Sequence, residues 1–547
     1  MADMADSLSG PLPARSEAVE AAPAIPVAWS PSFNPWLIAT VVALAAFMEV
    51  LDTSIANVAL PYMAGSLGVS NDESTWVLTS YLVSNAIVLP ISGWLVRVLG
   101  RKRLFMICLA IFTLSSLLCG LAPSLGALIF FRILQGAGGG GLQPLAQSIL
   151  ADSFPPDKRG IAFAVYGITV IVAPTVGPTL GGWITDNYSW RWIFFINLPV
   201  GILTLLLVLR FVEDPPWSKR IKNALAQIDY IGISLLVLGV GALQVMLDKG
   251  QEDDWLGSHF ILTFFILAIL GLGALFIWEW WFSKTPVVEV RLFKNLNFLG
   301  ANTMMFTLGV LYFSSLVLMP QYLQTLMGYT AETSGFVLTA GSAVLLFTMP
   351  LTGVLSGKFQ ARYLIAFGWL SLALGFWYSA VRLDLDISFG VASIIRVTQV
   401  VGLPLLFVPI NLVSFVGLPA EKSSSIAGLI NFMRNIGSSV GTSLVTTLIA
   451  RRAQLHQVNL AANVTPGGFT LQNAVTGLSN HLSAAGSNSE GALRQAYALL
   501  YRSTIGQATV LAYMDTYMIL AIGAAIMFAL SFLLRKNELG GGRVVVE

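Results

Sequence analysis

Long apolar stretches alternate with short polar segments along almost the whole chain. A transmembrane helix needs about 20 mostly apolar residues, and fourteen stretches of roughly this kind fall within residues 36–534. The pattern predicts an all-α polytopic membrane protein with helices at 36–60, 75–96, 103–122, 125–147, 161–182, 192–211, 229–247, 259–282, 297–319, 332–356, 363–381, 389–416, 425–449 and 512–534.

Composition supports this interpretation and narrows the function. Of 547 residues, 56% are hydrophobic and 11% are charged, whereas soluble domains have about 25% charged residues. The net charge of +2 argues against a nucleic-acid partner, and no basic cluster suggests one. Cys108 and Cys119 lie about 16 Å apart along one predicted helix, which is too far for a disulfide.

The distribution of Lys and Arg sets the expected orientation. Cytoplasmic loops carry the excess of these residues, and most of the 30 fall on one side if both termini are cytoplasmic. The strongest cluster is in the loop after the second span, with Arg97, Arg101, Lys102 and Arg103. Residues 1–33, polar and rich in Ala and Pro, are expected to be a disordered cytoplasmic tail.

The longest predicted loop is 450–511, on the outer side. It contains Pro466-Gly467-Gly468 and a helix-like run from Glu490 to Leu500, with Ser489 as the expected N-cap. We interpret the segment as a passive loop, with a partner-docking element as the alternative.

An internal repeat is visible in the spacing of polar residues. Arg132-x-x-Gln135-x-x-Gly138 in the fourth span recurs as Arg396-x-x-Gln399-x-x-Gly402 in the twelfth, 264 positions later. The sequence Pro90-x-Ser92-Gly93 recurs as Pro350-x-Thr352-Gly353, 260 positions later. Matches in the correct order on corresponding spans predict two copies of a six-helix unit.

This repeat predicts the division of the chain. Two six-helix halves, 34–212 and 297–534, would flank two inserted helices in 213–296, and 535–547 would be a second cytoplasmic tail. Parallel repeats of this kind are a transporter architecture, with the binding site at mid-membrane between the halves.

Two acids in the first span are the most costly residues in the predicted membrane. Glu49 and Asp52 are three residues apart and therefore share one helix face. A mid-membrane carboxylate costs about 2.5–3.5 kcal/mol on insertion scales. An acid that titrates in the working pH range can carry a proton across, so we interpret the pair as a proton-coupling site. The alternative is a pair held by interhelical hydrogen bonds.

Arg132 is the expected counter-charge, because an unpaired arginine in the membrane is costly. With Gln135, Gln143 and Gln147 it forms a polar stripe on the fourth span. The alternative is a packing arginine whose hydrogen bonds go to backbone carbonyls.

Further polar and aromatic residues are candidates for the substrate cavity. Arg396 with Gln399, and Arg434 with Asn431, Asn435 and Ser438, form similar stripes that would bind substrate or lock the halves together, with locking favoured for Arg434. Flexible Met and aromatic faces suit apolar ligands, which adds Tyr81, Met305, Phe306 and Tyr312.

Glycines at four-residue spacing predict close helix packing. Gly177 and Gly181, and likewise Gly437 and Gly441, have the GxxxG spacing. Pro174 and Pro178 are expected to bend the fifth span.

Apparent enzyme motifs lack their structural context. Gly136-x-Gly138-x-x-Gly141 and Gly437-x-Ser439-x-Gly441 lie inside predicted membrane helices with no preceding strand. We expect no cofactor, no metal and no enzymatic activity.

Several motifs together resemble the major facilitator superfamily and, within it, the fourteen-span drug:proton antiporters similar to EmrB and QacA. They are Leu51-Asp52-Thr53 through Asn57-Val58-Ala59-Leu60-Pro61, Gly93-Trp94-Leu95 through Gly100-Arg101-Lys102, Arg132-x-x-Gln135-Gly136, Gly177-Pro178-x-x-Gly181-Gly182, and Trp190 through Pro199. Arg97 departs from the usual Asp of the loop motif, which weakens any claim of a charge latch there.

The resemblance implies an inner-membrane transporter that exports hydrophobic compounds against proton entry. It makes Asp52 the first choice of proton carrier, with Glu49 assisting, and it implies a periplasmic adaptor and an outer-membrane channel as partners. Two alternatives stay open: export of a defined metabolite such as a fatty acid, which the intramembrane arginines allow, and a non-transporting scaffold or sensor.

Overall fold

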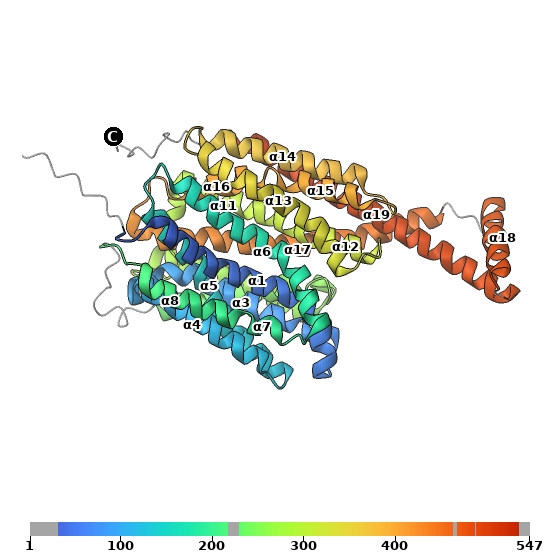
Figure 1. The fold of residues 1–547 in the computed structure, drawn as a ribbon, viewed down its shortest axis with the longest axis horizontal. Helices are drawn as coiled ribbons and strands as arrows, with labels where there is room; N and C mark the ends of the chain where they lie inside the picture. The colour runs from blue at the N-terminus through green and yellow to red at the C-terminus, as the bar shows by residue number, and fades with distance from the viewer. Residues whose placement is uncertain (1–30, 217–228, 463–467, 487, 535–547) are drawn as a thin grey trace, which may run out of the picture. The chain divides into compact units, whose positions relative to one another are not determined.

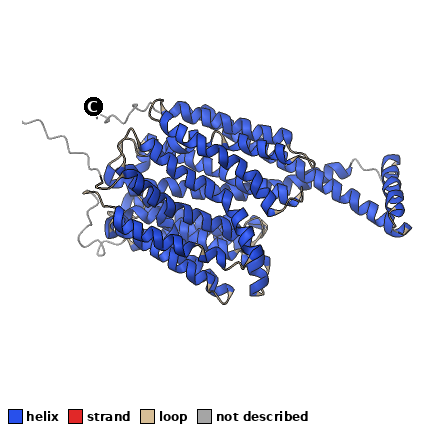
Figure 2. Ribbon diagram, in the orientation of Figure 1, coloured by secondary structure: helices blue, strands red, loops and turns tan. Residues whose placement is uncertain are grey.

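The backbone of an apolar span has no water to bond within a bilayer, so its amides and carbonyls must pair within the segment. The computed structural model describes residues 31–216, 229–462, 468–486 and 488–534. Within these ranges every regular element is a helix (Figure 2). The predicted all-α class is therefore confirmed. Apart from residues 31–33, the predicted tails lie outside the described residues.

Thirteen helices in the described ranges are long and apolar enough to cross a membrane. They comprise α1 (Pro35–Leu67), α2 and α3 (Asn71–Ser74, Trp76–Leu99), α4 (Arg101–Gly120), α5 (Leu125–Ser153), α6 (Arg159–Asn187), α7 and α8 (Trp192–Phe195, Asn197–Phe211), α9 (Tyr230–Lys249), α10 and η3 (His259–Ile277, Trp278–Phe282), α11, η5 and α12 (Leu296–Leu308, Gly309–Phe313, Ser314–Thr325), α13 (Ala331–Leu355), α14 (Ala361–Arg382), α15 and α16 (Phe389–Val400, Leu403–Ser414), and α19 (Ser489–Ser531).

The predicted count of fourteen differs by one because of α17 (Ser423–Ala462), where the thirteenth span was expected. This helix has 40 residues, which is ample length, but its sequence is rich in Ser, Thr and Asn. It packs against α3, α5, α11 and α19 (Figure 1). Its polar side chains therefore face other helices, and length and apolarity alone do not identify it as a span.

The segment predicted as a loop at 450–511 is largely helical, which corrects that expectation. Helix α17 continues to Ala462, and α18 spans Phe469–Ala484 before α19 begins at Ser489. The N-cap of α19 is Asn488, whose side chain accepts from the Gly491 amide at 2.8 Å, so the predicted cap was wrong by one residue. In Figure 1, α18 and the first turns of α19 extend beyond the neighbouring helices.

The membrane helices end at two opposite sides of the bundle, called the Arg101 end and the Asp72 end. The Arg101 end holds the turn between α3 and α4, and the Asp72 end holds the connection from α1 to α3. Gly100 makes the first of these turns with φ 84°, a left-handed conformation that favours glycine.

Glycines bring helices into close contact, as their spacing predicts. A Cβ on Gly177 would lie 2.5 Å from Ser54 Cβ, and one on Gly181 would lie 3.1 Å from Ile55 Cγ2. This pairs α6 with α1. A Cβ on Gly441 would lie 2.7 Å from Val310 Cα, which pairs α17 with η5 in the same way. The predicted packing role of both motifs is confirmed.

Helices distant in the sequence also meet at the Arg101 end. A Cβ on Gly93 of α3 would lie 2.6 Å from Ser425 Cα of α17. A Cβ on Gly160 of α6 would lie 2.6 Å from the carbonyl oxygen of Gly353 in α13. Helix α9 lies beside both α3 and α17. The contacts of Gly93 and Gly160 close the bundle at the Arg101 end.

Candidate functional site

Asp52 of α1 is surrounded by polar side chains of other helices, with 2% of its surface exposed. Its Oδ2 accepts from Arg132 Nη1 at 2.6 Å. Its Oδ1 accepts from Gln135 Nε2 at 2.9 Å and from Asn197 Nδ2 at 2.7 Å. The predicted pairing of Asp52 with Arg132 is confirmed, and both side chains are inaccessible to solvent.

Arg132 is held on several sides at once. Its Nη1 also donates to Gln135 Oε1 at 2.9 Å, and its Nε donates to the Val77 carbonyl at 3.1 Å. The guanidinium carbon lies 4.3 Å from the centre of the Tyr81 ring, a cation–π contact. One bond goes to a backbone carbonyl, as the packing alternative requires, but the acid is the main partner. The ion pair cancels the two charges inside the bundle.

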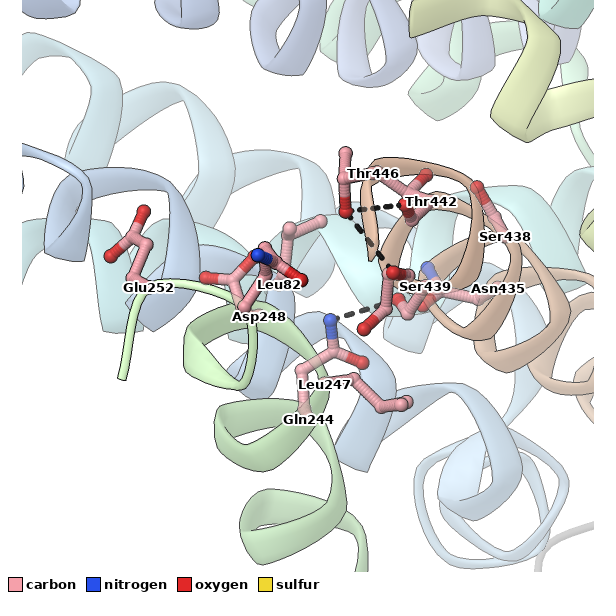
Figure 3. A pocket seen from close by; sticks show the side chains of 12 residues that line it. Leu82, Gln244, Leu247, Asp248, Glu252, Asn435, Ser438, Ser439, Thr442 and Thr446 are labelled. Carbon is pink, nitrogen blue, oxygen red and sulfur yellow. Dashed lines mark hydrogen bonds between the residues drawn. The ribbon is translucent and has the colours of Figure 1, made fainter. Parts of the chain in front are cut away.

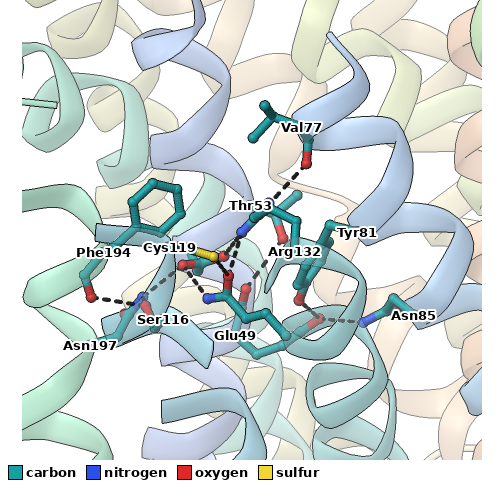
Figure 4. Close-up of polar contacts among 12 residues, drawn as sticks. Glu49, Thr53, Val77, Tyr81, Asn85, Ser116, Cys119, Arg132, Phe194 and Asn197 are labelled. Carbon is teal, nitrogen blue, oxygen red and sulfur yellow. Dashed lines mark hydrogen bonds and ion pairs between the residues drawn. The ribbon is translucent and has the colours of Figure 1, made fainter. Parts of the chain in front are cut away.

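Glu49 lies one turn earlier on α1 in a different environment, with 4% of its surface exposed. Its Oε1 accepts from Tyr81 Oη at 3.1 Å and from Asn85 Nδ2 at 3.0 Å (Figure 4). Its Oε2 accepts from Gln143 Nε2 at 2.5 Å. All of these donors are neutral. The two acids that the sequence treats as a pair therefore differ in their access to a counter-charge.

Gln143 connects Glu49 to α17. While its amide nitrogen donates to Glu49, its Oε1 accepts from Arg434 Nη2 and, at 3.3 Å, from Tyr166 Oη. A second bridge runs from Asn431 Nδ2 of α17 to Gln147 Oε1 of α5 at 2.7 Å. The polar stripe of α5 therefore joins Glu49 to α17, whose bridging residues are 284 and 291 positions from their α5 partners, as the locking interpretation of Arg434 expected.

The corresponding arginine on α15 forms no ion pair with any of the described residues. Arg396, 1% exposed, donates from Nη1 to Gln399 Oε1 at 3.2 Å and from Nη2 to Tyr312 Oη at 3.2 Å. Tyr312 stands 260 positions after Asp52 (312 − 52), the offset that also relates Pro90 to Pro350. The two copies of the arginine motif thus keep the Arg–Gln contact and differ in the third partner.

The aromatic and Met residues predicted to line a substrate cavity are mostly packed in this conformation. Tyr81 and Met305 are 1% exposed and Tyr312 is 0% exposed, whereas Phe306 is partly exposed. Two of them, Tyr81 and Tyr312, contact the buried arginines. Their assignment to a cavity stays a prediction.

The charged residues near the turn between α3 and α4 form two ion-pair clusters, one around Arg101 and one around Arg97. Arg101 Nη1 lies 2.5 Å from Asp152 Oδ2, and Asp152 Oδ1 accepts from Ser423 of α17 at 3.2 Å. Lys102 Nζ donates to the Leu209 carbonyl at 2.8 Å. Each contact ties this turn to another helix.

Arg97, which departs from the usual acid of this motif, has an acid partner of its own. Its Nη1 lies 2.8 Å from Glu289 Oε1, and Lys422 Nζ lies 2.5 Å from Glu289 Oε2. Glu289 belongs to the connection between η3 and α11. The three residues therefore form a charge bridge between α3, the segment after the inserted helices, and the turn η6 (Ala420–Lys422) that precedes α17.

Three functional partners were missed at the sequence level. Asn85 and Asn197 donate to the two acids, and Tyr166 donates to the bridging Gln143. Asn85 and Asn197 are 3% and 2% exposed. A single Asn in an apolar span is itself a signal, because an amide in the membrane needs a partner, but it does not say which acid it serves.

Comparison with known sequences identifies the family of the chain. The sequence model of the Major Facilitator Superfamily matches residues 42–442. The multidrug export protein EmrB of Escherichia coli (strain K12) is 39% identical over 424 residues, which are 78% of this chain and 82% of the relative. The fatty acid resistance protein FarB of Neisseria gonorrhoeae is 39% identical over 439 residues, 80% of this chain and 85% of the relative.

Solved structures agree on the fold. The proton:xylose symporter XylE has a TM-score of 0.57 at 13% identity, covering 93% of this chain and 98% of that one. The human organic anion transporter MFSD10 has a TM-score of 0.54 at 12% identity, covering 90% and 100%. With the family match, the high identity to EmrB and the shared fold, the chain belongs to the Major Facilitator Superfamily and, within it, to the EmrB-like multi-pass membrane transporters.

Proposed function

We propose that this protein is a multidrug:proton antiporter that exports hydrophobic compounds by alternating access. The observation that carries the proposal is the unequal setting of two buried acids. Asp52 is neutralised by Arg132 at 2.6 Å, whereas Glu49 is held only by neutral donors. The relation to EmrB, a multidrug export protein, supports the class of substrate.

The two acids differ in what a proton would disturb. A proton on Asp52 leaves Arg132 as an unpaired buried cation, and breaking a buried pair in this way costs about 3–5 kcal/mol. A proton on Glu49 breaks no direct ion pair, since its donors are Tyr81, Asn85 and Gln143. The nearest cation, Arg434, reaches Glu49 only through Gln143. We therefore assign the exchangeable proton first to Glu49. Asp52 would join only in a conformation in which the Arg132 pair has separated.

Protonation of Glu49 is linked to the helix contacts that must change during transport. Gln143 donates to Glu49 and accepts from Arg434 of α17, so a change of charge on Glu49 alters one side of a bridge between α5 and α17. In a parallel-repeat transporter, movement between such helices alternates access to the central site. Proton and substrate would occupy the region of Glu49 in turn.

The test is coupled transport in proteoliposomes containing a pH-sensitive dye. Addition of rhodamine 6G or ethidium on one side should drive proton movement with the wild-type protein and none with Glu49→Gln. Glu332→Gln, at the exposed first turn of α13, is the matched control and should behave as wild type. Full coupling by Glu49→Gln would overturn the assignment.

We also propose an inner-membrane location with both termini in the cytoplasm, supported by the Lys and Arg around the Arg101 end. A periplasmic adaptor and an outer-membrane channel would extend the route. Exposed apolar side chains on α18 and early α19 suit such a partner, with Phe469 80% exposed and Tyr501 61% exposed. Co-purification with an adaptor, lost on exchange of both residues for Ser, would test this.

A second candidate function is export of a fatty acid, by relation to FarB, a fatty acid resistance protein. Arg396 favours it, because its hydrogen bonds in the described residues go to neutral Gln399 and Tyr312 and its Nε has no partner there. A carboxylate could occupy that position. Competition between a long-chain fatty acid and a cationic dye in the same proteoliposomes separates the two functions, because a dedicated fatty-acid exporter would ignore the dye.

A further inference from the structure

A polar pocket lies between α9 and α17, apart from the site around Glu49 and Asp52. Its volume is about 310 Å³, within the range of small-molecule sites. Leu82 of α3, the C-terminal turns of α9 and one face of α17 line it (Figure 3). Helices α3 and α17 touch near the Arg101 end, and toward the Asp72 end α9 lies beside both of them. We call the space along this junction the seam pocket.

The seam pocket contains buried acceptors without a hydrogen-bond partner. Gln244 is 1% exposed; its Nε2 donates to Ser439 Oγ at 2.9 Å, but its Oε1 has no partner in the described residues. The same holds for Asn435 Oδ1 and for the hydroxyl of Ser443, which is 5% exposed. An unmet buried polar atom is costly. Two amide oxygens and a hydroxyl around one space call for a ligand that donates hydrogen bonds.

The charge at the pocket is negative. Asp248 lines it and accepts from Thr79 Oγ1 of α3, a neutral donor. Glu252 also lines it, but its carboxylate is 2.6 Å from Lys249 Nζ, which lies behind it against Asp72 and Thr75. One net negative charge therefore remains, on Asp248. Arg434, on the same helix as the α17 wall, is directed to Gln143 and does not neutralise it.

Apolar side chains also line the pocket. Leu82 and Leu247 line the pocket together with the acid and the amides. A ligand that fits has an apolar body, a positive charge and N–H donors. We propose that the seam pocket is a second binding site, separate from Glu49 and Asp52, for amphipathic organic cations that carry N–H groups.

The test is site-directed labelling of the full-length protein in lipid nanodiscs. Ser438→Cys places one thiol on the α17 wall, and the native Cys108 and Cys119 are 4% and 0% exposed, so they give little background. An ethylammonium thiosulfonate should label this thiol about tenfold faster than the sulfonate reagent, equivalent to about 1.4 kcal/mol of preference. Rhodamine 6G, a cation with N–H donors, should protect the thiol. Tetraphenylphosphonium, which has none, should protect it at least tenfold more weakly.

Companion variants separate this proposal from the proposed function. Asp248→Asn should raise the protecting concentration of rhodamine 6G about tenfold, whereas Asp253→Asn, on the exposed loop outside the pocket, should not change it. Protection should persist in Glu49→Gln even if that variant transports nothing. Equal labelling by both reagents without dye protection, at Ser438→Cys and also at Thr442→Cys, would overturn the inference and leave a pocket that holds water only.

Discussion

The Asp52–Arg132 pair allows a quantitative test by a double-mutant cycle. Arg132 is 0% exposed and its strongest contact is Asp52 at 2.6 Å. Exchange of Asp52 for Leu leaves a buried guanidinium without its acid, and removing one partner of a buried pair costs about 3–5 kcal/mol. Arg132→Leu leaves the carboxylate unpaired and should cost a similar amount. Exchange of both partners for apolar residues of similar size is often close to neutral.

We therefore expect each single variant to lose about 3–5 kcal/mol of unfolding free energy. The double variant should be no less stable than the less stable of the two single variants. SDS titration of the protein in mixed micelles, followed by circular dichroism, measures these free energies. Tyr312→Phe is the control, because it removes one hydrogen bond of 3.2 Å between Arg396 and an uncharged partner and breaks no ion pair. A hydrogen bond to a charged group contributes about 1.5–3 kcal/mol, so the loss should be smaller than for either charge variant. Additive losses in the double variant would refute the idea that the two charges depend on each other.

Three further changes test the contacts between helices. Glu289→Gln leaves the two cations at the Arg101 end without their shared acid, so a cysteine at position 425 should become more reactive toward water-soluble thiol reagents; unchanged reactivity would remove the charge bridge from the mechanism. Gly93→Ala places a Cβ 2.6 Å from Ser425 Cα and should abolish transport with normal expression, whereas Gly65→Ala meets nothing within 4 Å and should have no effect. Gln143→Leu removes the link between the first acid and α17 and should uncouple proton movement from drug binding in the proteoliposome assay; coupling at the wild-type level would show that the bridge is dispensable.

The pairing of Asp52 with Arg132 and the packing of Gly177 could be predicted because each rests on a local rule. A charged side chain in the membrane needs a partner, and a four-residue glycine spacing brings helices together. The internal repeat matched Arg396 and Gln399 to Arg132 and Gln135, and in the structure both pairs are in contact. Each rule states what a single residue or motif requires, so it can be applied to the sequence without a structure.

The partners that were missed lie far away in the sequence and have no distinctive pattern. Arg97 and Glu289 are 192 positions apart, and the acid belongs to a connecting segment with no span-like periodicity. The helix-like run predicted from Glu490 to Leu500 is confirmed as the start of α19. The helical form of α18 and the extension of α17 to Ala462 were missed, because they lie beyond the apolar stretches, where hydropathy no longer marks a helix. The different surroundings of Glu49 and Asp52 depend in part on Gln143 and Asn197, which reach α1 from two different helices.

Proton release on drug binding is the most direct measure of which acid exchanges its proton. Purified protein in a weakly buffered detergent solution would receive rhodamine 6G, and a pH indicator would record the protons released. We expect release by the wild type and by any folded Asp52→Asn preparation, and none by Glu49→Gln with an unchanged circular dichroism spectrum. Release by Glu49→Gln equal to that of the wild type would contradict the assignment of the exchangeable proton to Glu49.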